Sequence, residues 1–231
     1  MVSEIMLQQT QVARVVPKYH EFLTQFPDVQ TLALAPLGDV LRAWSGLGYN
    51  RRAKFLHQAA QRVVSEFRGK FPETIVGLMA LPGVGSNTAG AILAYAFDQP
   101  VSFIETNIRT VYIHHFFNDE SDISDKHILE LVEATLDHEH PREWYWALMD
   151  HGSFLKQTVG NLNHRSKSYA KQSKFEGSDR QIRGQILRLL GQSSMTETKL
   201  AELIPDARMP SILQDLLTEG LVHKQGRSLG L

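Results

Sequence analysis

The sequence predicts an all-α fold that ends in a small C-terminal domain with a winged-helix-like order of elements. Apolar residues recur at three- and four-residue steps up to about residue 117, which is the period of a helix buried on one face. The alternating pattern of a strand is almost absent before residue 220. Two glycines within 81–85 indicate a tight turn between two of the expected helices.

The expected helices follow one another along the first half of the chain. Pro17 should begin one of them in its first turn, with Val16 outside the α region, and Pro27 should end it. Four further helices are predicted, at 32–44, 53–67, 74–80 and 86–97.

The C-terminal part follows a predicted linker at 174–178. Three short helices are then expected, at 181–190, 197–204 and 209–219. A hairpin that turns at Gly226 comes after them. Three helices and a hairpin in about 55 residues predict a winged-helix-like domain at 178–231, related to the helix-turn-helix.

The composition excludes several classes of protein. With 231 residues, 42% of them hydrophobic and 21% charged, the chain is not a collagen, a coiled coil or a disordered protein. It has no cysteine, so a disulfide, a thiolate zinc site, an iron–sulfur cluster and a cysteine nucleophile are excluded. No apolar run reaches the ~18 residues of a membrane span, and no signal peptide is visible. We therefore expect a cytoplasmic protein.

The charges are unevenly distributed although the net charge is only −1. Residues 118–140 include eight acids and one lysine, whereas 156–174 include five basic residues and no acid. This contrast predicts an acidic and a basic side, or simply two solvated faces. A local basic surface is thus compatible with nucleic-acid binding, although a general electrostatic attraction is not expected.

The turn at 81–85 is a candidate phosphate site. Gly83 and Gly85 leave no side chain between the backbone and a ligand, and the helix expected from Ser86 directs free N–H groups toward the turn. These three residues, together with Asn87 and Thr88, can hold a DNA phosphate without reading the base sequence. An ordinary αα-hairpin with a glycine cap is the alternative.

Four segments, in order, resemble the endonuclease III and MutY family of DNA glycosylases. They are similar to the family's catalytic-glutamate helix, minor-groove loop, helix-hairpin-helix element and catalytic-aspartate segment, at 3–12, 44–49, 81–93 and 104–111. The resemblance covers about residues 1–156. It implies a helix-hairpin-helix glycosylase domain at 1–174, with a second subdomain at about 105–174 and no iron–sulfur cluster.

The resemblance implies a monofunctional glycosylase that removes adenine mispaired with guanine or 8-oxoguanine in base excision repair. A thymine or uracil mismatch glycosylase, or a catalytically silent DNA-binding protein, are the alternatives. The implied partner is double-stranded DNA with a mismatched or damaged pair. We expect a monomer associated with the nucleoid.

Three residues are implied to be catalytic. Glu4, expected to share a helix face with Gln8 and Gln11, corresponds to the acid that protonates the leaving base. Glu105 stands where the family has aspartate, and an anion there would stabilise the sugar cation. Its extra methylene changes the reach by roughly 1 Å. Asn107 is implied to place water or the sugar.

Further residues are implied to contact the duplex. Gln8, Gln9 and Tyr49 resemble the residues that wedge between bases and contact the opposite base. Arg51 and Arg52 follow and can meet phosphates, although a solvated basic run is the simpler alternative.

The sequence departs from the family at several points. Asn87 occupies the position where glycosylase/lyases have lysine, so no amine is expected there to form a Schiff base. The segment 156–174 replaces the four-cysteine loop, and the winged-helix-like segment replaces the domain with which MutY reads 8-oxoguanine. Members also begin with a helix before the one that carries Glu4, so either the start is truncated or that helix is lost. The histidines lack clean ligand spacing, so no catalytic metal is expected; a structural ion at the hairpin carbonyls is compatible with the family.

Overall fold

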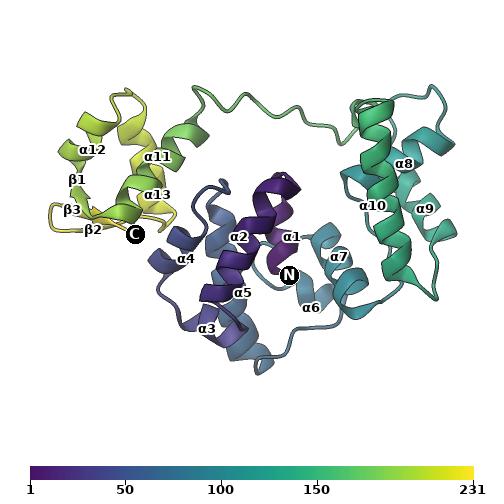
Figure 1. Ribbon diagram of the computed structural model, residues 1–231, viewed down its shortest axis with the longest axis horizontal. Helices are drawn as coiled ribbons and strands as arrows, with labels where there is room; N and C mark the ends of the chain where they lie inside the picture. The colour runs from purple at the N-terminus through teal and green to yellow at the C-terminus, as the bar shows by residue number, and fades with distance from the viewer. The chain divides into compact units, whose positions relative to one another are not determined.

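The computed structural model describes residues 1–231, which divide into two compact units (Figure 1). Unit 1 comprises Met1–Phe71, Leu81–Gly83 and Ser173–Leu231, and unit 2 comprises Pro72–Ala80 and Val84–Gln172. Helices dominate both units, which confirms the all-α prediction. No helix has the length and the apolar character that crossing a membrane requires.

The N-terminal part of unit 1 is built from five helices, which are α1 (Val2–Leu7), α2 (Val12–Gln25), α3 (Val29–Leu34), α4 (Leu37–Ala43) and α5 (Arg51–Phe67). Their core is aromatic at its centre, where the ring of Phe22 lies 4.9 Å from that of Phe26 and 6.1 Å from that of Trp44. The α5 helix presents an alanine-rich face that includes Ala59 and Ala60, both fully buried, so that α3 can pack closely against it.

Two predicted helix boundaries in this region are wrong. Pro17 does not begin a helix but lies inside α2, which begins at Val12. A proline there removes only one early hydrogen bond, and the burial of Val15 and Phe22 by the rest of the helix offsets this loss. The single helix expected at 32–44 is divided into α3 and α4, because Pro36 forces the preceding residue into an extended conformation.

The C-terminal part of unit 1 has the elements α11 (Asp179–Gln192), β1 (Met195–Thr196), α12 (Glu197–Leu203), α13 (Met209–Thr218), β2 (His223–Gln225) and β3 (Ser228–Gly230). The three predicted helices and the hairpin are present, and Gly226 turns the hairpin with φ of 61°. The strands form an antiparallel sheet in the order β1-β3-β2. Assignment of this part to the winged-helix class stays a prediction, as does its boundary as a separate domain.

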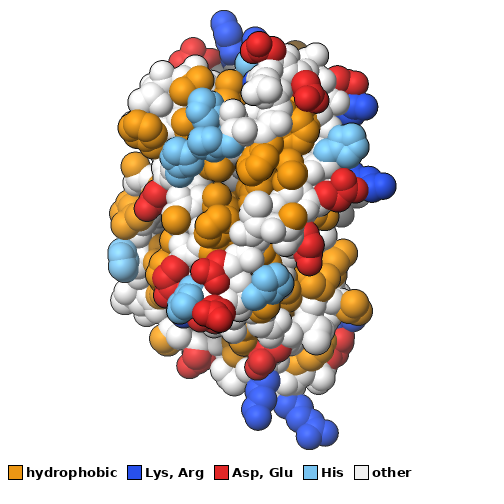
Figure 2. Space-filling view, turned by 90° about the vertical axis from the view of Figure 1, so that its right-hand side faces the viewer, with side chains coloured by type: hydrophobic (Ala, Val, Ile, Leu, Met, Phe, Trp, Pro, Cys, Tyr) orange, Lys and Arg blue, Asp and Glu red, His pale blue; other side chains and the backbone are white.

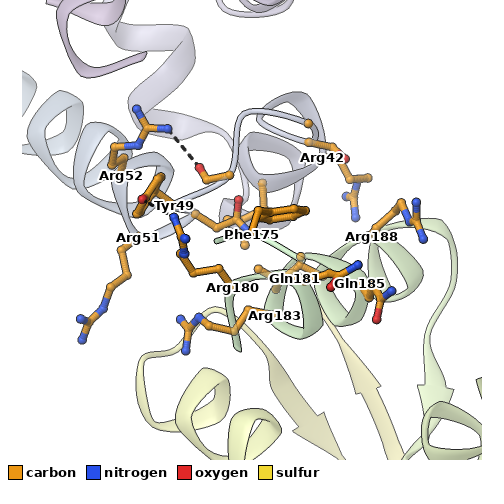
Figure 3. A pocket seen from close by; sticks show the side chains of 18 of the residues that line it. Arg42, Tyr49, Arg51, Arg52, Phe175, Arg180, Gln181, Arg183, Gln185 and Arg188 are labelled. Carbon is orange, nitrogen blue, oxygen red and sulfur yellow. Dashed lines mark hydrogen bonds between the residues drawn. The ribbon is translucent and has the colours of Figure 1, made fainter. Parts of the chain in front are cut away.

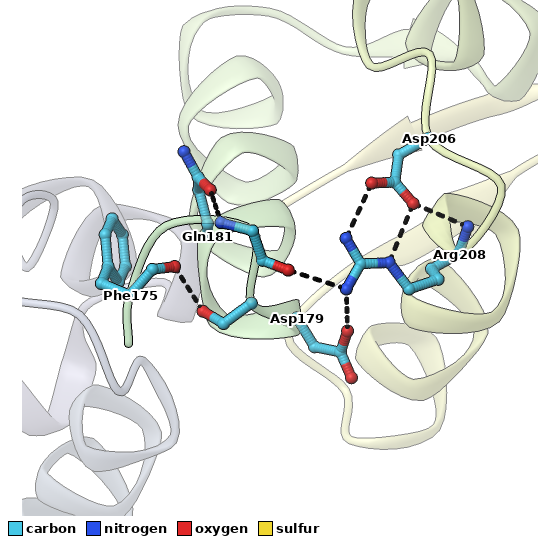
Figure 4. Close-up of polar contacts among 7 residues, drawn as sticks. Phe175, Asp179, Gln181, Asp206 and Arg208 are labelled. Carbon is cyan, nitrogen blue, oxygen red and sulfur yellow. Dashed lines mark hydrogen bonds and ion pairs between the residues drawn. The ribbon is translucent and has the colours of Figure 1, made fainter. Parts of the chain in front are cut away.

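Arg208, the N-cap of α13, connects the beginning of α11 with the loop before α13 (Figure 4). Its guanidinium pairs with Asp206 at 2.8 Å and with Asp179 at 2.9 Å, and it donates to the carbonyl of Gly177. These contacts lower the pKa of Asp206 to about 2, chiefly through the side-chain hydrogen bond from Arg208. The positive charge of Arg208 is therefore matched by two carboxylates.

Unit 2 contains α6 (Ile75–Met79), α7 (Ser86–Phe97), α8 (Thr106–Phe116), α9 (Asp125–Thr135), α10 (Pro141–Thr158) and a 3₁₀ helix (Leu162–Arg165). Its core centres on Phe103, Tyr112 and Tyr145, which are all almost completely buried. The α8 and α10 helices pack together so closely that a Cβ at Gly152 would lie 2.3 Å from the carbonyl oxygen of Asn107. Any larger residue at 152 would thus displace the beginning of α8.

The segment after α10 is held to α8 and to the loop that follows α8 by hydrogen bonds. The buried amide of Asn163 donates to the carbonyl of Thr106 and to the hydroxyl of Thr110. Arg165 donates to the carbonyls of Phe117 and Glu120. Side-chain donors therefore hold this segment against the backbone of α8 and of the loop that follows it.

Candidate functional site

The helix α1 carries the candidate acid. Glu4 is half-buried in its first turn, and the next two residues, Ile5 and Met6, are completely buried. The expectation that Glu4 shares one helix face with Gln8 and Gln11 is wrong, because α1 ends at Leu7. Gln8 is its C-cap, whereas Gln11 is the N-cap of α2.

Arg52 fixes the end of α1 from inside the protein. Its side chain is only 7% exposed, and its guanidinium donates to six acceptors. The acceptors are the carbonyls of Ile5, Met6, Gln8, Leu47 and Gly48, and the hydroxyl of Thr10. Carbonyls at a helix C-terminus have no partner within the helix, so a buried cation is well suited to bind them. Burial lowers the pKa of Arg52 to about 10.

Two of the three candidate wedge residues, Gln9 and Tyr49, have unusual backbones. Gln9 has φ of 58° and Tyr49 has φ of 46°, in the left-handed region that residues other than glycine rarely adopt. Gln9 is exposed, and the side chain of Tyr49 is 38% exposed. The Tyr49 ring lies 5.5 Å from the guanidinium of Arg52 and 5.5 Å from that of Arg180, which also donates to its hydroxyl at 2.6 Å (Figure 3).

Arg51 has a different environment from its neighbour Arg52. Its side chain is 64% exposed and pairs with Glu219 at 3.3 Å. Glu219 also pairs with Arg183, so one carboxylate from the C-terminal part serves two arginines. Arg51 is thus accessible to a phosphate, whereas the two terminal nitrogens of the Arg52 guanidinium already have acceptors within the protein.

The hairpin has the geometry that its two glycines predict. Gly83 has φ of 78°, and a Cβ there would lie 2.8 Å from the Cβ of Phe55. Gly85 is the N-cap of α7 without a side-chain cap, and a Cβ there would meet nothing within 4 Å. The first turn of α7, which begins at Ser86 and continues with Asn87 and Thr88, is therefore open to an anion on the side of Gly85. The side-chain oxygen of Asn87 accepts from the backbone N–H of Ile104 at 3.3 Å.

Glu105 is itself the N-cap of α8. One carboxylate oxygen accepts from the N–H groups of Asn107 and Ile108, and the other accepts from the hydroxyl of Thr106. A negative charge at this position is stabilised by the helix dipole and by these donors.

Lys156 joins Glu105 and Asn107, and sequence reasoning missed it. Its ammonium donates to the side-chain oxygen of Asn107 at 2.6 Å and to the hydroxyl of Thr106 at 3.1 Å. Burial lowers the pKa of Lys156, while the charge of Glu105 acts in the opposite direction. The sequence signal that could have found Lys156 is its position one helical turn after Gly152, because a small residue in a helix often marks a close helix contact. In the structure, α10 contacts α8 at Gly152.

Histidines gather beside exposed hydrophobic side chains on the face of unit 2 in Figure 2. The Nε2 atoms of His115 and His151 lie 2.8 Å apart, and the ring of His151 is stacked near Phe154, which is 58% exposed. Burial and the neighbouring histidines lower the pKa of His115. No cluster of three or more potential metal ligands is present in the chain.

Comparisons with known proteins show which family this chain resembles. Residues 2–136 match the family model of the "HhH-GPD superfamily base excision DNA repair protein". The adenine DNA glycosylase of Mycolicibacterium smegmatis is 32% identical over 97% of this chain and 83% of its own length. That of Buchnera aphidicola subsp. Baizongia pistaciae is 35% identical over 76% of this chain, which spans about half (52%) of that relative.

Solved structures show the same fold at lower identity. A thermostable thymine-DNA glycosylase matches with a TM-score of 0.58 and 23% identity, over 66% of this chain and 71% of that one. A non-covalent endonuclease III–DNA complex matches with a TM-score of 0.54 and 20% identity, over 67% and 70%. Together with the family match over more than half of the sequence, these likenesses show that the chain belongs to the HhH-GPD superfamily of base excision DNA repair proteins.

Proposed function

We propose that the protein is a monofunctional DNA glycosylase that hydrolyses the N-glycosidic bond of adenine mispaired with guanine or 8-oxoguanine. The observation that carries this proposal is the similarity of 97% of the chain to a protein named adenine DNA glycosylase. Glu4 at the beginning of α1 and Glu105 at the beginning of α8 supply the two carboxylates that the reaction requires.

Glu4 protonates the adenine in this proposal. Departure of a neutral purine is far easier than departure of its anion, and a positioned general acid contributes about 10²–10⁴-fold to the rate. The target nucleotide leaves the duplex before reaction, because its reacting atoms are not accessible in the base stack. Arg52 acts as a positioning residue, since it fixes the end of the helix that carries Glu4.

Glu105 stabilises the positive charge that develops on the sugar. Its carboxylate is held by two backbone N–H groups of α8, so it is in place before the bond breaks. Asn107, which Lys156 fixes at 2.6 Å, is next to it and orients the attacking water or the sugar. The charge of Glu105 acts in turn on the Lys156 ammonium, whose pKa it raises against the lowering effect of burial.

The DNA contacts come from the two loops and the hairpin. Gln8, Gln9 and Tyr49 enter the duplex beside the extruded adenine and contact the opposite base. Arg51 binds a phosphate, and the hairpin with Gly83 and Gly85 binds another through the backbone N–H groups at the beginning of α7.

Single-turnover base release from a panel of duplexes tests the proposal. The panel has adenine opposite 8-oxoguanine, guanine, cytosine and thymine, and thymine and uracil opposite guanine. We expect release of adenine opposite the two purines. Release of thymine without adenine would assign the protein to the thymine glycosylases, and binding without any release would make it a DNA-binding protein.

The Glu4→Gln variant tests the acid. Glutamine keeps the shape of the side chain, but its amide cannot act as an acid. Base release should therefore fall at least tenfold, while the affinity for the duplex stays the same. Glu66→Gln, the same substitution at an exposed position of α5, is the control and should react like the wild type. Retention of more than about a tenth of the rate by Glu4→Gln would exclude Glu4 as the general acid.

A further inference from the structure

Unit 1 contains a groove of about 910 Å³ (Figure 3). It lies between the helix α11 and two loops, one with Gln8 and Gln9 and the other with Gly48 and Tyr49. Seven arginines line it, with one glutamate, Glu219, and no lysine or aspartate. Five glutamines contribute to the same walls. The arginines are Arg14, Arg42, Arg51, Arg52, Arg180, Arg183 and Arg188.

The helical period of α11 places its arginines on the groove side. Arg180, Gly184 and Arg188 follow one another at four-residue steps and therefore share one face of the helix. The opposite face, with Ile182 and Ile186, is buried in the C-terminal part. A Cβ at Gly184 would meet nothing within 4 Å, so the floor of the groove between the two arginines is open.

Most of the positive charge in the groove is not neutralised. Glu219 serves both Arg51 and Arg183, and Arg42 pairs with Asp39 outside the lining. Arg14 and Arg188 are exposed and make no ion pair. A groove with this excess of guanidinium groups attracts a polyanion, and guanidinium binds phosphate in a bidentate manner.

The other lining residues fit a nucleic-acid strand better than an acidic protein. The aromatic rings of Tyr49 and Phe175 are 38% and 58% exposed, and exposed rings at a basic groove stack with bases. The glutamines, among them Gln181 and Gln185, can both donate to and accept from base edges.

We propose that this groove extends the nucleic-acid surface of Gln8, Gln9 and Tyr49 onto the helix α11, with Arg14 and Arg188 binding phosphates of a DNA strand. The C-terminal part thereby grips the same duplex as the glycosylase loops. This inference rests on the proposed function in one respect only, namely that the polyanion is DNA.

The salt dependence of binding to an undamaged duplex tests this site. A fluorescent 20-base-pair duplex without a mismatch is titrated at 50 to 200 mM KCl, beside the same single strand. Each phosphate contact contributes about 0.9 to the slope of log affinity against log salt for a duplex. Arg188→Gln and Arg14→Gln should each lower this slope by about 1, and the double variant by about 2. Between 50 and 200 mM KCl, the affinity of the wild type then falls by about 3.5-fold more than that of a variant that lacks one phosphate contact.

Arg208→Gln is the matched control. Arg208 belongs to the same C-terminal part, but it does not line the groove and its charge is paired with Asp206 and Asp179 (Figure 4). Its slope should equal that of the wild type, while circular dichroism verifies that all variants are folded.

Two results would overturn the inference. One is an unchanged slope in the Arg14/Arg188 double variant on both the duplex and the single strand. The other is displacement of the duplex by poly-glutamate of equal charge as efficiently as by unlabelled DNA, since the groove would then be a general anion surface. Because the duplex has no mismatch, neither result depends on base release, and failure of the glycosylase proposal appears only in the mismatch panel.

Discussion

Replacement of Arg52 by leucine should destabilise the protein by about 3–5 kcal/mol, the cost of breaking a buried charged network. Leucine fills part of the space but donates no hydrogen bond, so six acceptors lose their donor. Three of these belong to residues that are at most 2% exposed, Ile5, Met6 and Leu47. A buried acceptor without a donor costs about 1–3 kcal/mol, which is consistent with the same total.

The free energy of unfolding in urea measures this effect. A natural domain has about 5–15 kcal/mol of stability, so the variant should remain folded at low temperature with a much lower midpoint. Arg52→Lys should cost about half as much, because the three donors of an ammonium cannot reach six acceptors. Arg62→Leu, on the same helix but 40% exposed beside Glu66, is the control and should cost less than about 1 kcal/mol.

The same variants separate a positioning role from a purely structural one. In conditions where Arg52→Lys is fully folded, base release should still be slower than in the wild type, because the end of the helix that carries Glu4 is less firmly held. A cost of less than about 1 kcal/mol for Arg52→Leu would refute the reasoning, since it would mean that water satisfies these carbonyls.

Three further outcomes are expected. Glu105→Gln should lose at least a hundredfold in single-turnover rate, because the charge beside the sugar is lost, whereas Glu105→Asp, which still caps α8, should stay within about tenfold of the wild type. The abasic product should remain uncut until alkali is added and no borohydride-trapped adduct should form, since Lys156 is held by Asn107; an adduct that disappears in Lys156→Arg would contradict this and identify the amine. Burial lowers the pKa of His57, so stability should be complete above about pH 6.5, the value in the unfolded chain, and should fall as the pH drops below it toward the lowered folded value. Thermal unfolding at pH 7.5 and 5.5 measures this difference, which should be smaller in His57→Gln; an equal difference in both proteins would exclude His57 as its source.

Local signals allowed the prediction of several elements. The helix at 86–97 agrees with the structure at both ends, because Gly85 precedes it as the N-cap and Asp98 ends it in the left-handed conformation. The predicted helix at 53–67 begins two residues late, but its end at Phe67 is correct. The error at Pro17 shows the limit of such signals, since proline is tolerated where the rest of an amphipathic helix is well buried.

The environment of the candidate site depends on contacts that no local pattern contains. Arg52 and Arg51 are neighbours in a basic run, yet one is buried by α1 and the loop at 47–48 while the other is exposed. Lys156 reaches Asn107 across 49 residues of sequence, and Arg180 reaches Tyr49 across 131. Such pairings follow from the packing of helices and become visible only in three dimensions.

In the proposed complex with DNA, the contact between Arg180 and Tyr49 also couples the C-terminal part to the duplex. A base that stacks on the Tyr49 ring takes the place of the Arg180 guanidinium, which lies 5.5 Å from that ring. The released Arg180 guanidinium is then available to a phosphate, so its lost contact with the Tyr49 ring is offset by a new contact with DNA. Because such coupling is reciprocal, an anion that draws Arg180 away also makes the ring more accessible to a base. In the proposed complex, Tyr49 is therefore an intramolecular competitor of DNA for Arg180, and the C-terminal part sets how readily that exchange occurs.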